Sequence, residues 1–167
     1  MQYTSHEANK LLKQLTESYE LLLAKEVRSR DFLASLGEDP ESVRPDYDYC
    51  ETQKTLEQLE SKIRRVKHAL NVFNTTTVVP EFQMTIDELL VLIPQLTRKK
   101  MKLSEMKSRL PKQREVSMVR QSNIIDYRYI NYDLSQVEAD YGSTVDLLAR
   151  AQLALDKINN TCILEIE

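Results

Sequence analysis

The feature that most constrains this chain is an unbroken apolar spacing between residues 49 and 73. Steps of three and four residues alternate for more than three heptads and connect Tyr49, Thr52, Leu56, Leu59, Ile63, Val66, Leu70 and Phe73. This spacing places one stripe along a helix and is the period of coiled coils. The sequence therefore predicts a helix over residues 48–73 with one face packed against a partner helix.

A second long helix is predicted before it. Thr4 and Glu7 have the spacing of a capping box, which opens a helix by satisfying two backbone amides. We expect this helix to reach Leu36 and to end at Gly37, because glycine favours a left-handed C-cap. Its stripe pauses at Glu26 and Ser29 and contains Ala8, Leu12, Leu15, Tyr19, Leu22, Leu33 and Leu36. The two helices together predict an antiparallel hairpin over residues 1–74.

The rest of the chain predicts two more helices with short strands near their ends. A β-branched strand or loop is expected over residues 75–84, and a helix kinked by Pro94 over residues 85–110. A loop and strand over 111–132, a helix over 133–160 and a terminal strand over 161–167 follow. The fold class is thus all-α in bulk. It is expected to be a single domain over residues 1–167, built as a long antiparallel coiled-coil bundle of about four helices.

Composition and residue spacing exclude further fold classes and several kinds of functional site. Only two glycines occur, which excludes a large β-barrel or sandwich and a Gly-rich phosphate loop. The two histidines, His6 and His68, lack the Glu-x-x-His spacing of di-iron bundles, and Cys50 and Cys162 lack the spacing of zinc ligands. No nucleophile motif occurs. We therefore expect no metal site, no cofactor and no enzyme activity.

Charge is distributed unevenly along the chain, although the net charge is only −3. Residues 31–60 carry nine acidic and two basic side chains, whereas residues 97–120 carry nine basic and two acidic ones. The two segments could pair with each other, within the fold or between subunits, and such a solvated or paired face is the usual role of charge runs. Alternatively, the basic segment could bind nucleic acid, with Tyr127, Tyr129 and Tyr132 stacking on bases. The candidate basic surface is Arg98, Lys99, Lys100, Lys102, Lys107 and Arg109.

The narrow stripes favour self-association, because long helices that bury little within one chain leave apolar seams in water. The seam expected to carry packing or assembly is Leu56, Leu59, Ile63, Val66 and Leu70. We therefore expect a homo-oligomeric, non-enzymatic coiled-coil scaffold or protein-interaction module, with nucleic-acid binding through residues 97–120 as the alternative. The first residues do not have the pattern of a signal peptide, so a cytoplasmic location is expected.

Several short stretches, taken in order, resemble the septicolysin-like family of small bacterial helical proteins. They are Lys62–Val66 with Asn74–Thr76, Met84–Leu90, Ile125–Tyr129, Tyr132–Leu134 and Leu155–Thr161. The resemblance implies a helical, coiled-coil-based protein of the bacterial cytoplasm and carries no catalytic residues over. The family name suggests a haemolysin, but the Val72–Val79 run is too short for a membrane-spanning strand pair, so a membrane-active role is the least favoured alternative. Family members commonly have Asn-Trp-Thr near their end, whereas this chain has Asn160-Thr161-Cys162.

Overall fold

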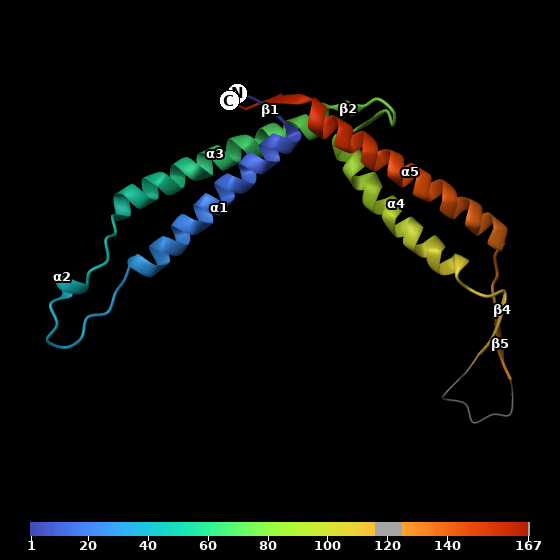
Figure 1. Ribbon diagram of the computed structural model, residues 1–167, viewed down its shortest axis with the longest axis horizontal. Coiled ribbons are helices and arrows are strands. Elements are labelled where there is room, and N and C mark those ends of the chain that lie inside the picture. The colour runs from blue at the N-terminus through green and yellow to red at the C-terminus, as the bar shows by residue number, and fades with distance from the viewer. Residues whose placement is uncertain (116–124, 167) are drawn as a thin grey trace. The chain divides into compact units, whose positions relative to one another are not determined.

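The computed structural model describes residues 1–115 and 125–166, and 68% of these residues are helical. Figure 1 shows the helices and strands in chain order. The helices of the described part are α1 (Ser5–Ser29), α2 (Pro40–Val43), α3 (Tyr49–Thr76), α4 (Ile86–Lys107) and α5 (Leu134–Thr161). Three two-stranded sheets pair β1 (Gln2–Thr4) with β6 (Ile163–Glu165), β2 (Val78–Val79) with β3 (Met84–Thr85), and β4 (Lys112–Arg114) with β5 (Tyr127–Tyr129). The prediction of a mostly helical chain with a few short strands is confirmed.

The chain divides into two compact units. One unit contains Met1–Val78 and Asp156–Glu167, and the other contains Val79–Leu155. Helix α5 runs through both, because its residues up to Leu155 belong to the second unit and its last turns to the first. The single domain expected over residues 1–167 stays a prediction, since a shared helix is compatible with one domain or two.

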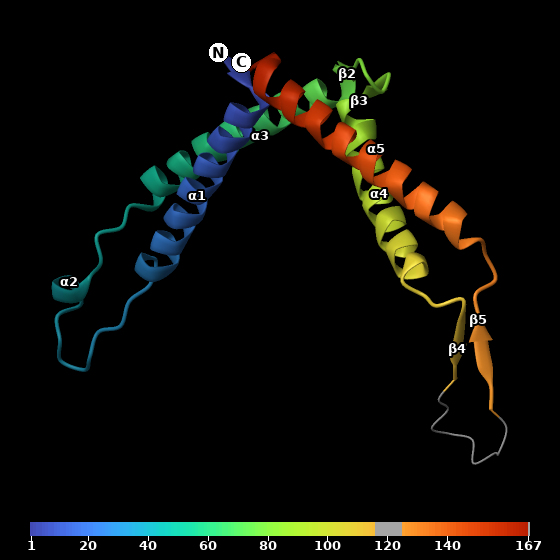
Figure 2. The ribbon, with the colours of Figure 1, turned by 45° about the vertical axis from the view of Figure 1, so that its right-hand side comes forward.

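In the first unit, α1 and α3 lie side by side (Figures 1 and 2). The predicted stripe of α3 supplies its buried side chains, which are Leu56, Val66, Leu70 and Phe73. Two polar bridges fix the pair: the Tyr19 hydroxyl donates to Glu60 at 2.8 Å, and Glu26 accepts from Tyr47 and Gln53. Apolar packing along the seam, with hydrogen bonds at its edges, therefore holds the hairpin together.

The predicted end of the first helix is wrong by about two turns. Helix α1 ends at Ser29 rather than near Leu36, and Leu33 is 96% exposed. Its partner α3 begins only at Tyr49, so residues beyond Ser29 have no facing helix to cover an apolar stripe. A helix without tertiary packing is marginal in water, and the chain leaves the helix at this point. Gly37 does adopt the left-handed conformation, at φ +89°, but in the loop rather than at a helix cap.

The two ends of the chain meet in the β1–β6 sheet of the same unit. The strands are antiparallel, with Tyr3 opposite Leu164, and the Met1 amino group donates to the Ile166 carbonyl at 2.9 Å. Leu164 is buried, so this strand closes one end of the apolar core. The terminal strand is confirmed over Ile163–Glu165. Strand β1 was not predicted, because its three residues are too few to show the alternation of apolar and polar side chains that indicates a strand.

In the second unit, α4 lies beside the N-terminal part of α5 (Figures 1 and 2). The helix start predicted at Thr85 is confirmed as a capping box with Glu88, and Pro94 lies inside the helix. The Tyr132 hydroxyl donates to the Met106 carbonyl at 2.8 Å and ties the end of α4 to the start of α5. The buried side chains of these two helix segments are Ile86, Leu89, Leu96, Leu103, Val137, Thr144, Leu148 and Ala151.

The two halves of the chain repeat one order of elements. Strand β1 leads into α1 through Thr4, and strand β3 leads into α4 through Thr85, with a complete capping box in both cases. Helix α3 leads into β2, and helix α5 leads into β6. Each half is therefore a strand, a helical hairpin and a second strand. The hairpin ends in a long loop carrying α2 in one half and in the β4–β5 ribbon in the other.

The assigned capping box of α4 can be tested by removing its cap residue. Replacing the cap residue, Thr85→Ala, leaves the amide of Glu88 without its acceptor and should cost about 1 kcal/mol of unfolding free energy. Thr97→Ala in the same helix is the matched control, because the Thr97 hydroxyl bonds only to the Ile93 carbonyl one turn back. Urea unfolding followed by helical circular dichroism measures both. Equal stability of the two variants would contradict the assigned cap.

Candidate functional site

The predicted seam of α3 is covered within the chain itself. Leu56, Val66 and Leu70 are buried, while Leu59 and Ile63 are half-buried, and the helix that packs on α3 is α1. The seam therefore works in packing the hairpin. The part of this seam that remains open to another molecule is the exposed portion of Leu59 and Ile63.

A shallow apolar groove of about 650 Å³ lies beside the seam, between α1 and α3. Leu21, Leu22 and Leu59 supply much of its apolar lining, and Leu21 is 74% exposed. Ser18, Lys25 and Arg28 are among the polar residues at its rim. Leu21 was not predicted as a site residue because it lies outside the apolar stripe of its helix. The signal available was the run of three leucines at positions 21–23, which is too broad for one stripe.

A larger groove of about 810 Å³ lies along the C-terminal half of α3 and β6. Its floor is apolar and includes Val72, Phe73 and Ile163, and its edge carries Arg64, His68 and Glu165. Cys162 also lines it and is half-buried, whereas Cys50 is exposed elsewhere on the same unit. The groove joins residues about ninety positions apart, so the sequence could not show it.

The predicted basic surface is divided between different environments. Arg98, Lys99 and Lys102 are exposed on α4, and Lys100 is half-buried. The Lys107 ammonium lies 5.2 Å from the centre of the Tyr141 ring, and Arg109 forms an ion pair with Glu105 at 2.6 Å. The six residues therefore do not form one uniform cationic patch. The last basic residue of the segment, Arg120, lies outside the described residues.

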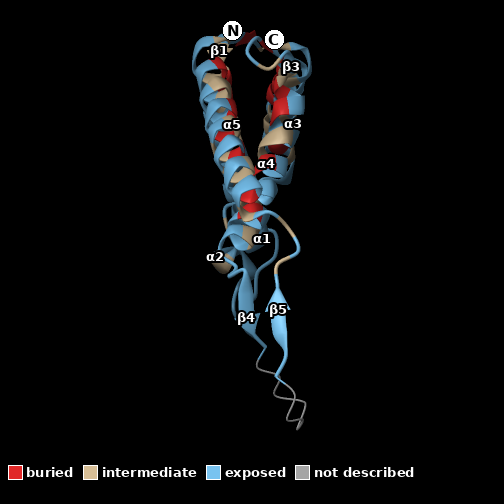
Figure 3. Cartoon of the chain, turned by 90° about the vertical axis from the view of Figure 1, so that its right-hand side faces the viewer, coloured by how far each residue is buried: buried red, intermediate tan, exposed pale blue. Residues whose placement is uncertain are grey.

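A compact cationic and aromatic face forms on the β4–β5 ribbon, which is exposed throughout (Figure 3). The register places Lys112 opposite Tyr129 and Arg114 opposite Tyr127, so all four side chains share one face. The Lys112 ammonium lies 4.2 Å from the Tyr127 ring centre and 5.5 Å from that of Tyr129. We call these four residues the cationic face.

The opposite side of the ribbon has a different chemistry. The Arg128 guanidinium donates two hydrogen bonds to the Glu115 carboxylate, at 2.8 and 3.0 Å, and these bonds hold the pKa of Glu115 below its ordinary value. Across residues 1–115 and 125–166, neither Lys112 nor Arg114 forms a salt bridge. The cationic face therefore presents its charge to solvent, while the charge on the other side is internally neutralised.

The three tyrosines suggested for stacking on bases differ in exposure. Tyr132 is half-buried, and its hydroxyl is occupied by the Met106 carbonyl. Tyr127 and Tyr129 are exposed and remain available to a ligand. Residues 116–124, which cover part of the predicted loop and strand, lie outside the described residues.

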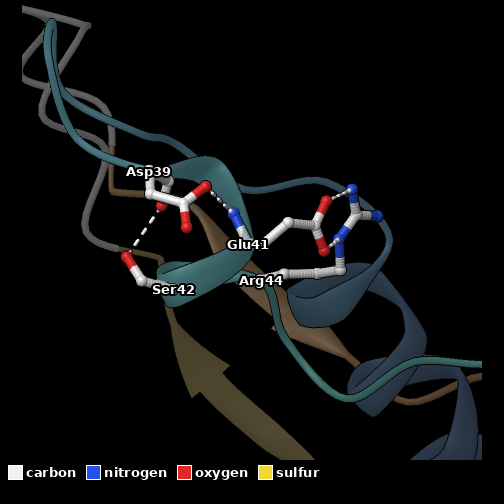
Figure 4. Close-up of polar contacts among 4 residues, drawn as sticks. All are labelled: Asp39, Glu41, Ser42 and Arg44. Carbon is white, nitrogen blue, oxygen red and sulfur yellow. Dashed lines mark hydrogen bonds and ion pairs between the residues drawn. The ribbon is translucent and has the colours of Figure 1, made fainter.

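An acidic loop, residues 31–48, joins α1 to α3 and carries α2. Figure 4 shows its organising contacts: Asp39 accepts from the Glu41 amide at 3.1 Å, and the Glu41 carboxylate accepts two hydrogen bonds from Arg44. The Arg44 guanidinium thereby lowers the pKa of Glu41 and also lies 5.4 Å from the Phe32 ring centre. We call this segment the acidic tip.

Most carboxylates of the acidic tip have no cationic partner. Asp31 lies 3.7 Å from the adjacent Arg30, and Glu41 pairs with Arg44. The other four acidic residues of the tip form no salt bridge with any residue that the structure describes, and they are Glu38, Asp39, Asp46 and Asp48. Asp39 and Asp48 instead cap α2 and α3. The tip therefore exposes unpaired negative charge at the end of the hairpin.

Two further observations concern metal binding and membrane crossing, neither of which the sequence favours. Among the described residues, no group of three or more His, Cys, Asp or Glu side chains could hold a metal ion. None of the helices in that part of the chain combines the length and the apolar character that crossing a membrane requires. Most of the Val72–Val79 run is helical, up to Thr76.

The comparisons with known proteins describe the fold and not the function. No protein-family model and no curated protein matches this chain. A solved structure that matches is the crystal structure of a functionally unknown conserved protein from Corynebacterium diphtheriae, with a TM-score of 0.63 and 17% sequence identity. The match covers 99% of this chain and 100% of that chain. At this identity the likeness shows the fold alone.

The burial of the α3 seam predicts that shortening a buried side chain destabilises the fold far more than shortening an exposed one nearby. Leu70→Ala should lower the unfolding free energy by about 2–5 kcal/mol, because it leaves a cavity in the α1–α3 core. Val72→Ala, two residues along the same helix but on its exposed side, should change it by about 0.5 kcal/mol or less. Urea unfolding of the two variants measures the difference. Similar losses would contradict the assigned seam.

The hydrogen bond between Tyr19 and Glu60 predicts that the pKa of Tyr19 depends on the Glu60 carboxylate. The Glu60 carboxylate accepts a hydrogen bond from the Tyr19 hydroxyl and, with its negative charge, raises the pKa of Tyr19 above the ordinary 10.0. A phenol with a raised pKa stabilises the fold fully below pH 10.0, and this contribution is lost as pH rises through the folded pKa. Glu60→Gln should return the Tyr19 pKa towards 10.0, while Glu57→Gln on the same helix should not. Tyrosine-resolved NMR titration distinguishes the two.

Proposed function

We propose that this protein is a non-enzymatic scaffold or interaction module that self-associates through its helical hairpin. The observation that supports the proposal is the apolar groove between α1 and α3, with Leu21 74% exposed beside the closed seam. Two packed helices cover each other along one line only. The sides of the pair stay open unless a further helix covers them.

The energetics favour a helical partner for this groove. Full burial of one leucine side chain is worth about 1.5–3 kcal/mol, and Leu21, Leu22 and Leu59 lie together there. The rim residues Lys25 and Arg28 carry long stems that can lie over an incoming apolar side chain while their charges stay in water. A second hairpin placed on this side turns a pair of helices into a bundle. Coiled-coil packing between copies belongs to the same proposal.

Membership of the septicolysin-like family and a place in the bacterial cytoplasm are also part of the proposal. Both rest on the stretches that resemble the family, such as Met84–Leu90 and Leu155–Thr161. The first of these stretches forms the capped start of α4, and the second the last turns of α5. The structural role of both stretches is consistent with a fold-specific sequence pattern.

Nucleic-acid binding is the second candidate, and the cationic face is the observation that favours it. Exposed Tyr127 and Tyr129 offer rings for base stacking, and Lys112 and Arg114 offer charges for phosphates. The overall charge of −3 works against binding, because phosphate contacts need a positive field. Affinity that falls steeply with salt would support this candidate, whereas binding that ignores salt would contradict it.

The self-association proposal predicts different effects of the same charge at two positions of α1. Leu21→Asp should reduce the mass in solution, because a carboxylate in the apolar groove must be desolvated when a second copy binds. Thr16→Asp is the matched control: it adds the same charge to the same helix at an exposed position that does not line the groove. Light scattering coupled to size-exclusion chromatography measures both masses.

Two outcomes overturn the proposal. A wild-type chain that is monomeric over the whole accessible concentration range has no self-association to explain. An oligomer whose mass is unchanged by Leu21→Asp assembles through another surface, and the groove is then not the interface. Helical circular dichroism of both variants checks that any loss of mass is not a loss of fold.

A further inference from the structure

We propose that the acidic tip of one copy docks on the cationic face of another copy of this chain. The proposal rests on the self-association proposed above and adds a second contact to it, at the ends of the hairpins rather than along them. It is carried by two observations on the same chain: a face of unpaired cations with tyrosines, and a loop of unpaired carboxylates with exposed leucines.

The cationic face has the geometry of a binding surface. Its side chains are held by the strand register, with Lys112 between two tyrosine rings. Both cations lack a carboxylate partner throughout the described chain, so a ligand carboxylate would not have to displace one. The ammonium already lies over aromatic rings, and that arrangement stabilises its position without neutralising its charge.

An apolar hollow lies beside the ribbon that carries the cationic face. A pocket of about 380 Å³ lies between the end of α4 and the ribbon, and its lining from the two strands is Tyr129 of the cationic face with Gln113 and Arg128 of the opposite face. Met106, Leu110 and Ile130 line it, and Leu110 is 63% exposed. Lys102 stands at the same pocket, and so does Arg109, whose charge is already paired with Glu105. A partner that fits this surface must therefore supply carboxylates and apolar side chains close together.

The acidic tip supplies that combination. Leu33 and Leu36 are almost fully exposed, and they stand within a few residues of Glu38 and Asp39. Asp46, at the other end of the tip, forms no salt bridge or hydrogen bond among the described residues. Exposed leucines next to unpaired acids have no role in the packing of their own hairpin. They match the pocket and the cationic face in both polarity and charge.

Complementary charges of this kind mainly set the partner and the rate of encounter. The contact should therefore weaken with salt, since the screening length falls from about 10 Å at 0.1 M to about 3 Å at 1 M. Each copy carries one acidic tip and one cationic face. Two copies that exchange both contacts form a closed symmetric dimer, and copies that make one contact each way continue head to tail as a ring or an open chain. The apolar groove, in contrast, should keep its contact at high salt.

Charge reversal of each surface tests the proposal. One variant carries Lys112→Glu with Arg114→Glu, and the other carries Glu38→Lys with Asp46→Lys, which reverses two unpaired carboxylates and leaves the helix caps Asp39 and Asp48 in place. Either variant alone should lose mass at low salt, down to the mass of the wild-type chain at high salt. An equimolar mixture should regain the low-salt mass, because each reversed surface then finds its complement. A misfolded variant could not be rescued in this way.

The matched control is Lys54→Glu with Lys62→Glu. It makes the same change in charge as Lys112→Glu with Arg114→Glu, at two exposed positions of α3 that belong to neither surface, and it should keep the wild-type mass. Light scattering at low and high salt is the readout for all variants. A fluorescent single-stranded oligo-dT is titrated against each variant in parallel.

Several outcomes overturn the proposal, and they leave the groove proposal separately testable. Unchanged mass in either reversed variant, or a mixture that does not regain mass, shows that the two surfaces do not meet between copies. Oligonucleotide binding that is lost with Lys112→Glu and Arg114→Glu at unchanged mass assigns the cationic face to nucleic acid. In these cases the effect of Leu21→Asp still decides the groove. A wild-type chain that is monomeric at low salt overturns both proposals.

Discussion

The rest of this structure depends on the packing of α1 against α3. Long helices are unstable in water unless one face is covered, and the seam containing Leu56, Val66 and Leu70 provides that cover in the first unit. The same requirement explains where the helix ends. Helix α1 stops at Ser29 because α3, beginning at Tyr49, offers nothing beyond that point for a further turn to pack on.

A pair of helices closes one seam and leaves both of its sides and its loop open. The apolar groove beside the seam, with Leu21, follows from the first consequence. The exposed leucines and carboxylates of residues 31–48 follow from the second, since no core exists at the end of a hairpin to bury them. The apolar groove and the acidic tip are thus consequences of packing only two helices together, which buries few residues and leaves many exposed.

Local chemistry made much of this fold predictable. The capping boxes at Thr4 and Thr85 and the three-and-four spacing of α3 each depend on residues within a few turns of one another. The missed elements depend on partners far along the chain. Strand β1 exists because β6 pairs with it, and β4 because β5 does. Strands β5 and β6 lie in segments predicted to contain a strand, but a window of local sequence does not show which segment pairs with them. Among the site residues, the exposure of Leu21 and the partial burial of Tyr132 were not predicted, because exposure is not a local property.

The sequence by itself determined the helical class, the positions of the helix starts, the stripe of α3 and the separation of acidic and basic segments. These follow from periodicity, capping and charge, which act over short distances along the chain. Only the tertiary structure decided which stripe residues are covered within the chain and where the apolar grooves lie. It alone also showed that Lys112, Arg114, Tyr127 and Tyr129 share one face. The physical reason is that burial and strand register are relations between residues distant in sequence, and folding alone brings those residues together.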